Sequence, residues 1–409
     1  MLAIDARFLN VCITHGYAVD RWCHVVNCLI EKDPGHPKIN RLRVIHLYEA
    51  DYNLILKIMW RRLLRHADNH NALLPDQWGS RPGKNSIEVV VLKQFTYMLA
   101  HLLHMPLACF DNDAAACYDR IIPALAMMSC RRLGLPTNLS ELNASMLAQA
   151  RYRVKTLMGI AELFFLCAFG TGQGSGNSPM VWLAVSILLI GGMAKLCEGI
   201  SVQSPTGKYK AKRNMDAFVD DSTTWVGSFD NPLCSPRQLG KKLQQSAQTW
   251  EQLLSASGGK LQLSKCFFYM MCWKWDTEGK PTLMTSTQMN YDMKMIDTQS
   301  GTIKSIKKKE CTDAHRTLGA WPGPFCKETH QPQNLKDKSV GFARIKKTIK
   351  ITKRLTDISN WMLYLPSMIY LLPSTCLTKK DLDKVESPVT REILNASGYY
   401  NSNFPRVAV

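Results

Sequence analysis

The sequence predicts an α+β protein with two or three subdomains. Its 409 residues exceed what one hydrophobic core usually fills. Short apolar runs typical of strands alternate with longer segments of helical periodicity, and no long low-complexity linker separates them. Acidic residues stand at the ends of two strand-like runs, so the expected sheet carries carboxylates.

The chain is strongly basic. Its 51 Lys and Arg residues outnumber 33 Asp and Glu residues, for a formal net charge of +18. This balance favours a polyanionic partner such as nucleic acid, although membrane-surface and ribosome-associated proteins share it. Fourteen Cys residues follow no regular framework, and the N-terminus does not read as a secretory signal. We therefore expect an intracellular protein with reduced thiols.

Two helices are expected in the first quarter of the chain. Apolar residues recur at helical spacing over residues 51–66, with basic residues between them. Residues 74–84 hold two Pro and two Gly residues and predict a loop. Asn85, followed three positions later by Glu88, is a capping pattern that predicts a helix over residues 86–101.

An acidic cluster follows the next strand-like segment. Residues 107–110 are apolar and lead into Asp111, Asp113 and Asp119, after which apolar residues resume. This order is typical of a strand, a turn and a helix.

A glycine-rich segment precedes the most apolar part of the chain. Residues 170–179 hold four glycines, and residues 180–194 are almost entirely apolar. The apolar stretch is shorter than the roughly 20 residues that a bilayer span needs. We expect a buried helix there and no membrane partner.

Asp220 and Asp221 are adjacent in an otherwise apolar segment. The β-branched and aromatic residues of 217–226 favour a hairpin that turns at these two acids. Unpaired carboxylates are costly to bury, and a divalent metal offsets that cost. Two Mg²⁺ ions about 4 Å apart can activate a 3′-hydroxyl and stabilise a leaving pyrophosphate. The cluster at 111–119 can add a carboxylate if its strand pairs beside the hairpin.

Three segments resemble, in order, the palm motifs A, B and C of reverse transcriptases: FDNDAAACYDR, GTGQGSGNSP and AFVDD. The resemblance implies a right-hand polymerase with fingers, a palm built on an antiparallel sheet, and a helical thumb. It implies partial fingers over 1–104, a palm over 105–325 with 131–165 returning to the fingers, and a thumb with C-terminal helices over 326–409. The implied activity is RNA-directed DNA synthesis.

The resemblance also assigns the metal ligands. It places the acid of the first motif at Asp113, while Asp111, which also follows the apolar strand, stays an alternative. Asp220 and Asp221 would complete a catalytic site for two Mg²⁺ ions, with Mn²⁺ as a possible substitute.

Further residues of these motifs resemble the nucleotide site of the family. Tyr118 would be the steric gate against a ribose 2′-hydroxyl, so the enzyme would select deoxynucleotides. Gln173, Gly174 and Phe218 would lie near the incoming nucleotide, where glycine allows a close backbone approach. Lys265 resembles the motif D lysine that protonates the leaving pyrophosphate.

Weaker similarity continues upstream. Lys32 and Arg43 resemble fingers residues that hold the triphosphate, where cations offset developing charge. The sequence QWGSRPGKNS, which contains Arg81, resembles the fingers segment QxGFRPGxST of non-LTR, LINE-type retroelements. Trp78 and Ser80 depart from that pattern.

The C-terminal third is basic. A helix expected over residues 341–355 would carry Lys346, Lys350 and Lys353 on one outer face. Charge of one sign favours a thumb helix that follows a nucleic-acid backbone over an ordinary solvated face. The implied partners are an RNA template, a DNA primer and dNTPs.

Other interpretations stay open. Two C-x-x-x-H spacings could bind zinc, with Cys311, His315, Cys326 and His330 as ligands. The motifs also fit an inactive or domesticated retroelement fragment that binds RNA without polymerising, and an intron-maturase-type reverse transcriptase.

Overall fold

The computed structural model describes residues 2–32, 34–36, 38–115, 117–156, 158–166, 170–204, 206–227, 234–325, 330–349, 352–375 and 377–396. The chain divides into two units. Unit 1 comprises Met1–Lys84, Pro106–Met270 and Met289–Lys308, and unit 2 comprises Asn85–Met105, Met271–Gln288 and Lys309–Val409. Both units combine helices and strands, as the predicted α+β class requires. The predicted bounds of fingers, palm and thumb stay a prediction.

Unit 1 holds most of the strands. Its helices are α1 (Leu2–His15), η1 (Asp20–Cys23), η2 (Ile39–Arg41), α2 (Ala50–Asn69), α4 (Cys117–Arg120), α5 (Pro123–Arg132), α6 (Thr137–Gln149), α7 (Ser178–Leu196) and α8 (Pro236–Ala256). Its strands are β1 (His24–Glu31), β2 (Leu42–Leu47), β3 (Leu107–Asp113), β4 (Arg151–Thr156), β5 (Gly159–Ile160), β6 (Ile200–Gln203), β7 (Lys210–Arg213), β8 (Met215–Phe218), β9 (Asp221–Gly227), β10 (Phe267–Met271), β13 (Lys294–Ile296), β14 (Ile303–Ser305) and β15 (Lys307–Lys308).

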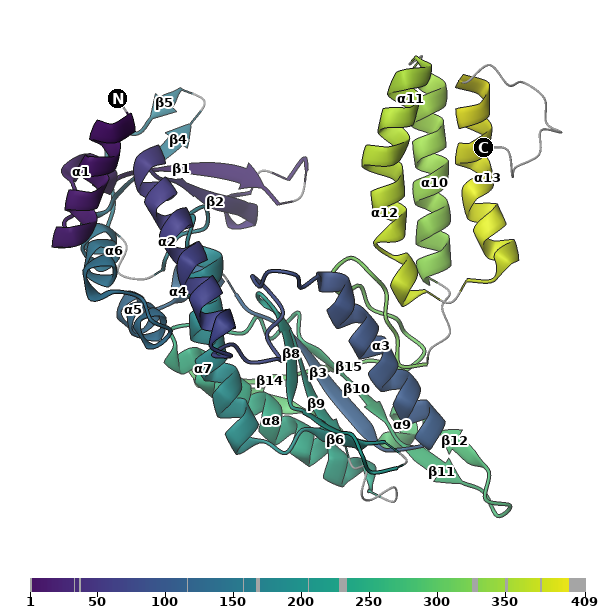
Figure 1. The fold of residues 1–409 in the computed structure, drawn as a ribbon. Helices are drawn as coiled ribbons and strands as arrows, with labels where there is room; N and C mark the ends of the chain where they lie inside the picture. The colour runs from purple at the N-terminus through teal and green to yellow at the C-terminus, as the bar shows by residue number, and fades with distance from the viewer. Residues whose placement is uncertain are drawn as a thin grey trace. The chain divides into compact units, whose positions relative to one another are not determined.

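The central sheet of unit 1 has the strand order β15-β10-β3-β9-β8 (Figure 1). Strand β3 pairs antiparallel with β9, and Asp113 lies opposite Asp221. Strands β8 and β9 form the predicted hairpin, in which Phe218 also lies opposite Asp221. The strand that enters the acidic cluster therefore lies beside the hairpin.

A second sheet and a buried helix complete the frame of unit 1. The sheet has the order β2-β1-β4-β5, with β1 antiparallel to β2 and parallel to β4. Helix α7 confirms the predicted buried helix, because apolar residues line most of its circumference and it contacts α5 and α8. By length and composition α7 and α3 could cross a membrane, but α7 is mostly buried, as a core helix is.

Unit 2 is mainly helical. Its elements are α3 (Ser86–Leu103), β11 (Trp273–Trp275), β12 (Pro281–Leu283), α9 (Ser286–Met289), α10 (His330–Thr348), α11 (Lys353–Ser359), η3 (Asn360–Tyr364), α12 (Leu365–Ile369), η4 (Leu372–Ser374) and α13 (Lys379–Ala396). Helix α3 begins with the predicted capping box of Asn85 and Glu88. Its Val90 joins a core that includes Leu335, Tyr364 and Val389.

The predicted basic helix of the C-terminal third is wrong in its extent. Helix α10 ends at Thr348, and α11 begins at Lys353. Lys346 is only 9% exposed, and its Nζ donates to the carbonyl oxygen of Thr356 at 3.1 Å. A long aliphatic stem can be buried when its ammonium finds an acceptor. Lys346 therefore does not belong to an outer stripe, Lys350 lies outside the described residues, and Lys353 is exposed.

Candidate active site

A cavity of about 560 Å³ in unit 1 brings together residues that the motifs single out. The predicted residues in its wall are Lys32, Arg43, Asp113, Tyr118, Gln173, Asp220 and Lys265. They come from the β1 and β2 region, the β3 end, the glycine-rich segment, the hairpin turn and the segment before β10. Residues far apart in the chain thus converge on one space.

Three carboxylates, Asp113, Asp119 and Asp220, line this cavity. Burial raises the pKa of Asp220, and the neighbouring Asp113 carboxylate raises it further. Lys265 Nζ lies 2.8 Å from Oδ2 of Asp113. Asp221 is paired with Asp113 across the strands, but it is exposed and is not among the described residues of the cavity wall.

The donor chemistry of Asp113 and Asp220 suits a hard divalent cation, because a cation relieves the repulsion between two carboxylates. Within the described part of the chain, however, no group of three or more His, Cys, Asp or Glu side chains is arranged to hold a metal ion. Two of the three predicted ligands therefore meet in the cavity, and metal binding stays a prediction.

The two acids of strand β3 have different surroundings. Asp111 is buried and accepts a hydrogen bond from Thr223 Oγ1 at 2.6 Å. Asp113, two residues later, stands where the strand ends and lines the cavity. Of the two alternative metal ligands, Asp113 is the one that reaches the cavity.

The hairpin turn before Asp220 is held in an uncommon conformation. Val219 has a φ of 60°, a left-handed value that costs energy for a β-branched residue. Trp182 Nε1 donates to the carbonyl oxygen of Val219 at 2.5 Å. Gly79 lies so close that a Cβ there would be 2.4 Å from the Val219 amide nitrogen. The Gly79 segment and helix α7 thus fix the backbone that presents Asp220.

Arg81, predicted to bind nucleic acid, has its partners within unit 1. Its guanidinium donates to the carbonyl oxygens of Leu74 and Gln77 at 2.9 and 3.3 Å. It also forms an ion pair with Asp68 at 3.2 Å, and its side chain is 14% exposed. In this structure Arg81 shapes the loop, and its contact with nucleic acid stays a prediction.

The glycine-rich segment packs against strand β2. The amide of His46 donates to the carbonyl oxygen of Gln173 at 2.7 Å. A Cβ at Gly174 would lie 2.4 Å from the His46 carbonyl oxygen, so only glycine permits this approach. Burial lowers the pKa of His46 to about 4, so its ring is neutral at pH 7. Gln173 reaches the cavity wall, whereas Gly174 and Phe218 are not among its described residues.

Tyr118 lies in the cavity wall at the start of helix α4. Its carbonyl oxygen accepts the amide of Thr171 at 2.8 Å, which joins the first motif to the glycine-rich segment. Burial raises the pKa of the Tyr118 hydroxyl, so the hydroxyl is neutral at physiological pH.

Two wall residues with charged or amide side chains received no role from the sequence: Asp119 and Gln262. Asp119 stood in the acidic cluster, one position after Tyr118. Gln262 follows the two adjacent glycines after α8, and its amide donates to the carbonyl oxygen of Asp113 at 2.9 Å. The glycine pair was the available signal for a close approach in this region.

The alternative zinc site falls in unit 2 and is only partly described. Cys326 lies outside the described residues. His315 Nδ1 lies 2.5 Å from Lys309 Nζ, and the His330 ring stacks on Trp321 with ring centroids 5.3 Å apart. Zinc binding stays a prediction.

No family model and no curated protein matches the chain. Among solved structures, the chain is similar to apo telomerase from Candida tropicalis truncated from its C-terminal domain, at 14% identity and a TM-score of 0.41 over 71% of this chain and 56% of that one. It is also similar to Candida tropicalis telomerase in complex with a TWJ fragment of telomeric RNA, at 15% identity and a TM-score of 0.45 over 99% of this chain and 59% of that one. The chain thus spans less than two thirds of either telomerase chain, and the likeness is too distant to carry an argument about function.

Proposed function

We propose that the chain is the polymerase core of an RNA-directed DNA polymerase that adds dNTPs to a primer 3′-hydroxyl. One observation carries the proposal. Asp113, Gln173 and Asp220, which belong to three separate motifs in the order of reverse transcriptase motifs A, B and C, line the same cavity. A carboxylate pair with a raised pKa on Asp220 is typical of a functional site.

The cavity offers both signs of charge to a nucleotide. Lys32 and Arg43 line it from the β1 and β2 region, and these cations would hold the triphosphate oxygens and offset developing charge. Asp113 and Asp220 would hold Mg²⁺, with Asp221 as the adjacent third acid. Bound there, the metal would supply Lewis-acid stabilisation to the attacking 3′-oxygen and the leaving pyrophosphate.

Two further residues have roles toward the substrate. Lys265 Nζ lies 2.8 Å from Oδ2 of Asp113 and would donate a proton to the leaving pyrophosphate. Tyr118 would exclude a ribose 2′-hydroxyl and so select deoxynucleotides. The net charge of +18 would hold template RNA and primer through their phosphates. The LINE-type segment at Arg81 favours a retrotransposon as the source.

Primer extension on an RNA template with Mg²⁺ tests this function, with dNTPs and rNTPs supplied separately. Wild type is expected to extend with dNTPs. Asp220→Ala is expected to lose at least about 10³-fold of the rate, because it removes a residue of a catalytic unit. Glu198→Ala is the matched control, since Glu198 is an exposed acid of the same unit that is paired only at the surface.

Circular dichroism must show that the Asp220→Ala chain is folded. Equal extension by wild type and Asp220→Ala would end the assignment. RNA binding without extension by the folded wild type would instead favour the inactive, RNA-binding fragment.

Sugar selection tests Tyr118 separately. Tyr118→Ala should raise ribonucleotide incorporation at least about tenfold relative to deoxynucleotide incorporation, because loss of a steric clash is worth a few kcal/mol. Single-nucleotide incorporation measures this ratio. An unchanged ratio would contradict the gate.

A further inference from the structure

A short segment, residues 259–262, runs along the backbone at Asp113. The amide of Gln262 donates to the Asp113 carbonyl oxygen at 2.9 Å. The amide of Ala115 donates to the Lys260 carbonyl oxygen at 2.7 Å. These two hydrogen bonds hold the backbone from the Asp113 carbonyl to the Ala115 amide, directly after the Asp113 Cα, at the point where strand β3 ends.

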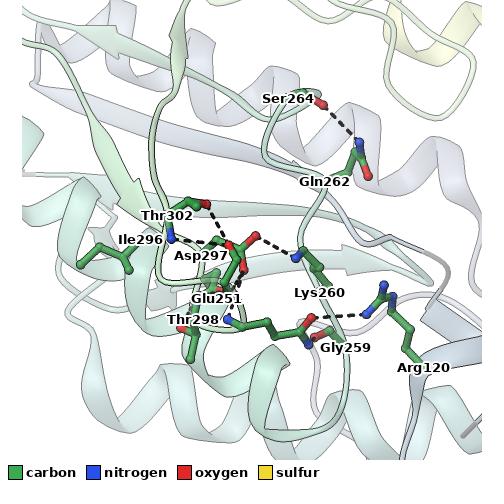
Figure 2. A network of polar contacts seen from close by, with 12 residues as sticks. Arg120, Glu251, Gly259, Lys260, Gln262, Ser264, Ile296, Asp297, Thr298 and Thr302 are labelled. Carbon is green, nitrogen blue, oxygen red and sulfur yellow. Dashed lines mark hydrogen bonds and ion pairs between the residues drawn. The ribbon is translucent and has the colours of Figure 1, made fainter.

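Two side-chain contacts attach this segment to the turn between β13 and β14 (Figure 2). Lys260 Nζ lies 2.8 Å from Oδ2 of Asp297, and Gln299 Nε2 donates to the Gly259 carbonyl oxygen at 3.0 Å. The Asp297 side chain is 4% exposed, and its Oδ1 accepts the amides of Gln299 and Ser300. Burial acts to raise the pKa of Asp297, but hydrogen bonds from Lys260 and Ser300 lower it overall. Asp297 is therefore a buried, fully engaged anion.

The turn between β13 and β14 is also attached to helix α8. Glu251 is 2% exposed, and its Oε1 accepts the amide of Thr298 at 3.0 Å, while its Oε2 accepts the hydroxyl of the same residue. Gln248, one helical turn earlier, bonds both the amide and the carbonyl oxygen of Ile296, at 2.8 and 2.9 Å. Because α8 also packs against β3 and β9, the turn and the central sheet share one support.

We infer that Asp297 and Lys260 are positioning residues for the Asp113 carboxylate. Neither is in the cavity wall among the described residues. They act through the backbone hydrogen bonds between the 259–262 segment and the end of β3. The same segment leads to Lys265, whose amide donates to the Gln262 carbonyl oxygen at 2.8 Å. Loss of the Lys260–Asp297 ion pair would therefore displace both partners of the Asp113–Lys265 ion pair.

The expected loss of rate rests on the proposed function, whereas the expected displacement of the backbone at Asp113 does not. A displacement of a catalytic group by about 1 Å can cost on the order of 10²-fold in rate. Substrate binding by Lys32 and Arg43, on other elements, would be little affected. The expected signature is a fall in kcat with an unchanged KM for dNTP.

The test uses the full chain with Asp297→Asn, Lys260→Met, the double variant and Lys260→Arg. The double variant avoids leaving one buried charge without its partner. Lys242→Met is the matched control, because it breaks a 2.7 Å ion pair with Glu198 in the same unit whose side chains are 46% and 77% exposed.

Hydrogen–deuterium exchange at the amides of Ala115 and Gln262 is the first readout. We expect about tenfold faster exchange in Asp297→Asn, Lys260→Met and the double variant, since these amides report local opening. Lys242→Met should match wild type, and Lys260→Arg should restore most of the protection. Unchanged exchange at both amides in the double variant would overturn the inference.

Primer extension is the second readout. The three disruptive variants should lose about 10- to 100-fold in kcat with KM for dNTP unchanged. Faster exchange with unchanged kcat, or the same loss in Lys242→Met, would overturn a positioning role. If folded wild type does not extend primers, the proposed function fails. The exchange rates at Ala115 and Gln262 still test the structural part. Faster exchange in the double variant supports the Lys260–Asp297 pair as a support for Asp113, and unchanged exchange refutes it.

Discussion

Two carboxylates of the β8–β9 hairpin, Asp216 and Asp220, have different surroundings. Asp216, in strand β8, is 3% exposed and accepts hydrogen bonds from the Arg213 guanidinium and, at 2.7 Å, from Trp225 Nε1. Asp220, at the turn of the same hairpin, faces the cavity, where burial and the Asp113 charge raise its pKa.

The difference separates a structural charge from a functional one. Only four positions separate the two acids. Asp216 has a guanidinium and an indole as partners, whereas Asp220 shares its cavity with the acids Asp113 and Asp119. Carboxylates whose charge is disfavoured in the protein cluster at sites that bind cations or transfer protons. Asp220 therefore fits a ligand-binding role, and Asp216 stabilises the hairpin that presents it.

Substitution of the two acids should give opposite results, and this is the largest effect expected on stability. Asp216→Ala should lower the free energy of unfolding by about 3–5 kcal/mol, because it leaves Arg213, only 14% exposed, without its carboxylate. Asp220→Asn should leave stability unchanged or slightly raised, because it removes a desolvated charge. Urea unfolding followed by tryptophan fluorescence measures both, and equal destabilisation by the two changes would erase the distinction.

Another carboxylate, Asp76, extends the comparison to the pH dependence of stability. Burial raises its pKa to about 6, and the Asp216 charge contributes. The unfolded value is about 3.9, so the group favours folding when protonated and loses that contribution as pH rises through about 6. Asp76→Asn should therefore raise the melting temperature by about 2–4 °C at pH 8 and leave it nearly unchanged at pH 4. Differential scanning calorimetry at the two pH values decides, and a gain independent of pH would show that charge is not the cause.

Parts of the fold governed by neighbouring residues were predictable. The capping pair Asn85 and Glu88, the turn at Asp220 and the buried helix α7 all follow from side chains within a few positions of one another. The motifs and the weaker upstream similarity also named most of the charged and polar residues that line the cavity, because their order in the chain is specific.

Other features depend on contacts across the chain and left no local signal. A lone acid such as Asp297 in a polar turn reads as a solvated residue, and only tertiary packing places it against Lys260. Asp221 follows Asp220 directly in the sequence but is not among the described residues of the cavity wall, and their adjacency in the chain did not distinguish the two acids. Lys346 looked like part of an outer face because its periodicity was helical, yet the chain folds Thr356 over its ammonium.

The smallest expected effect concerns two lysines of unit 2, the buried Lys346 and the exposed Lys353. Lys346 packs on Phe342, with Nζ 4.9 Å from the ring centroid, and burial lowers its pKa. Lys346→Met keeps the length of the stem, so stability should change by less than about 1.5 kcal/mol, and the affinity for an RNA–DNA duplex should be unchanged.

Lys353→Ala removes an exposed cation, and if this region contacts phosphates the slope of log affinity against log salt should fall by about 1. Fluorescence anisotropy with a labelled duplex across a salt series measures the slopes. A reduced slope for Lys346→Met alone would assign phosphate binding to the buried lysine and refute the distinction.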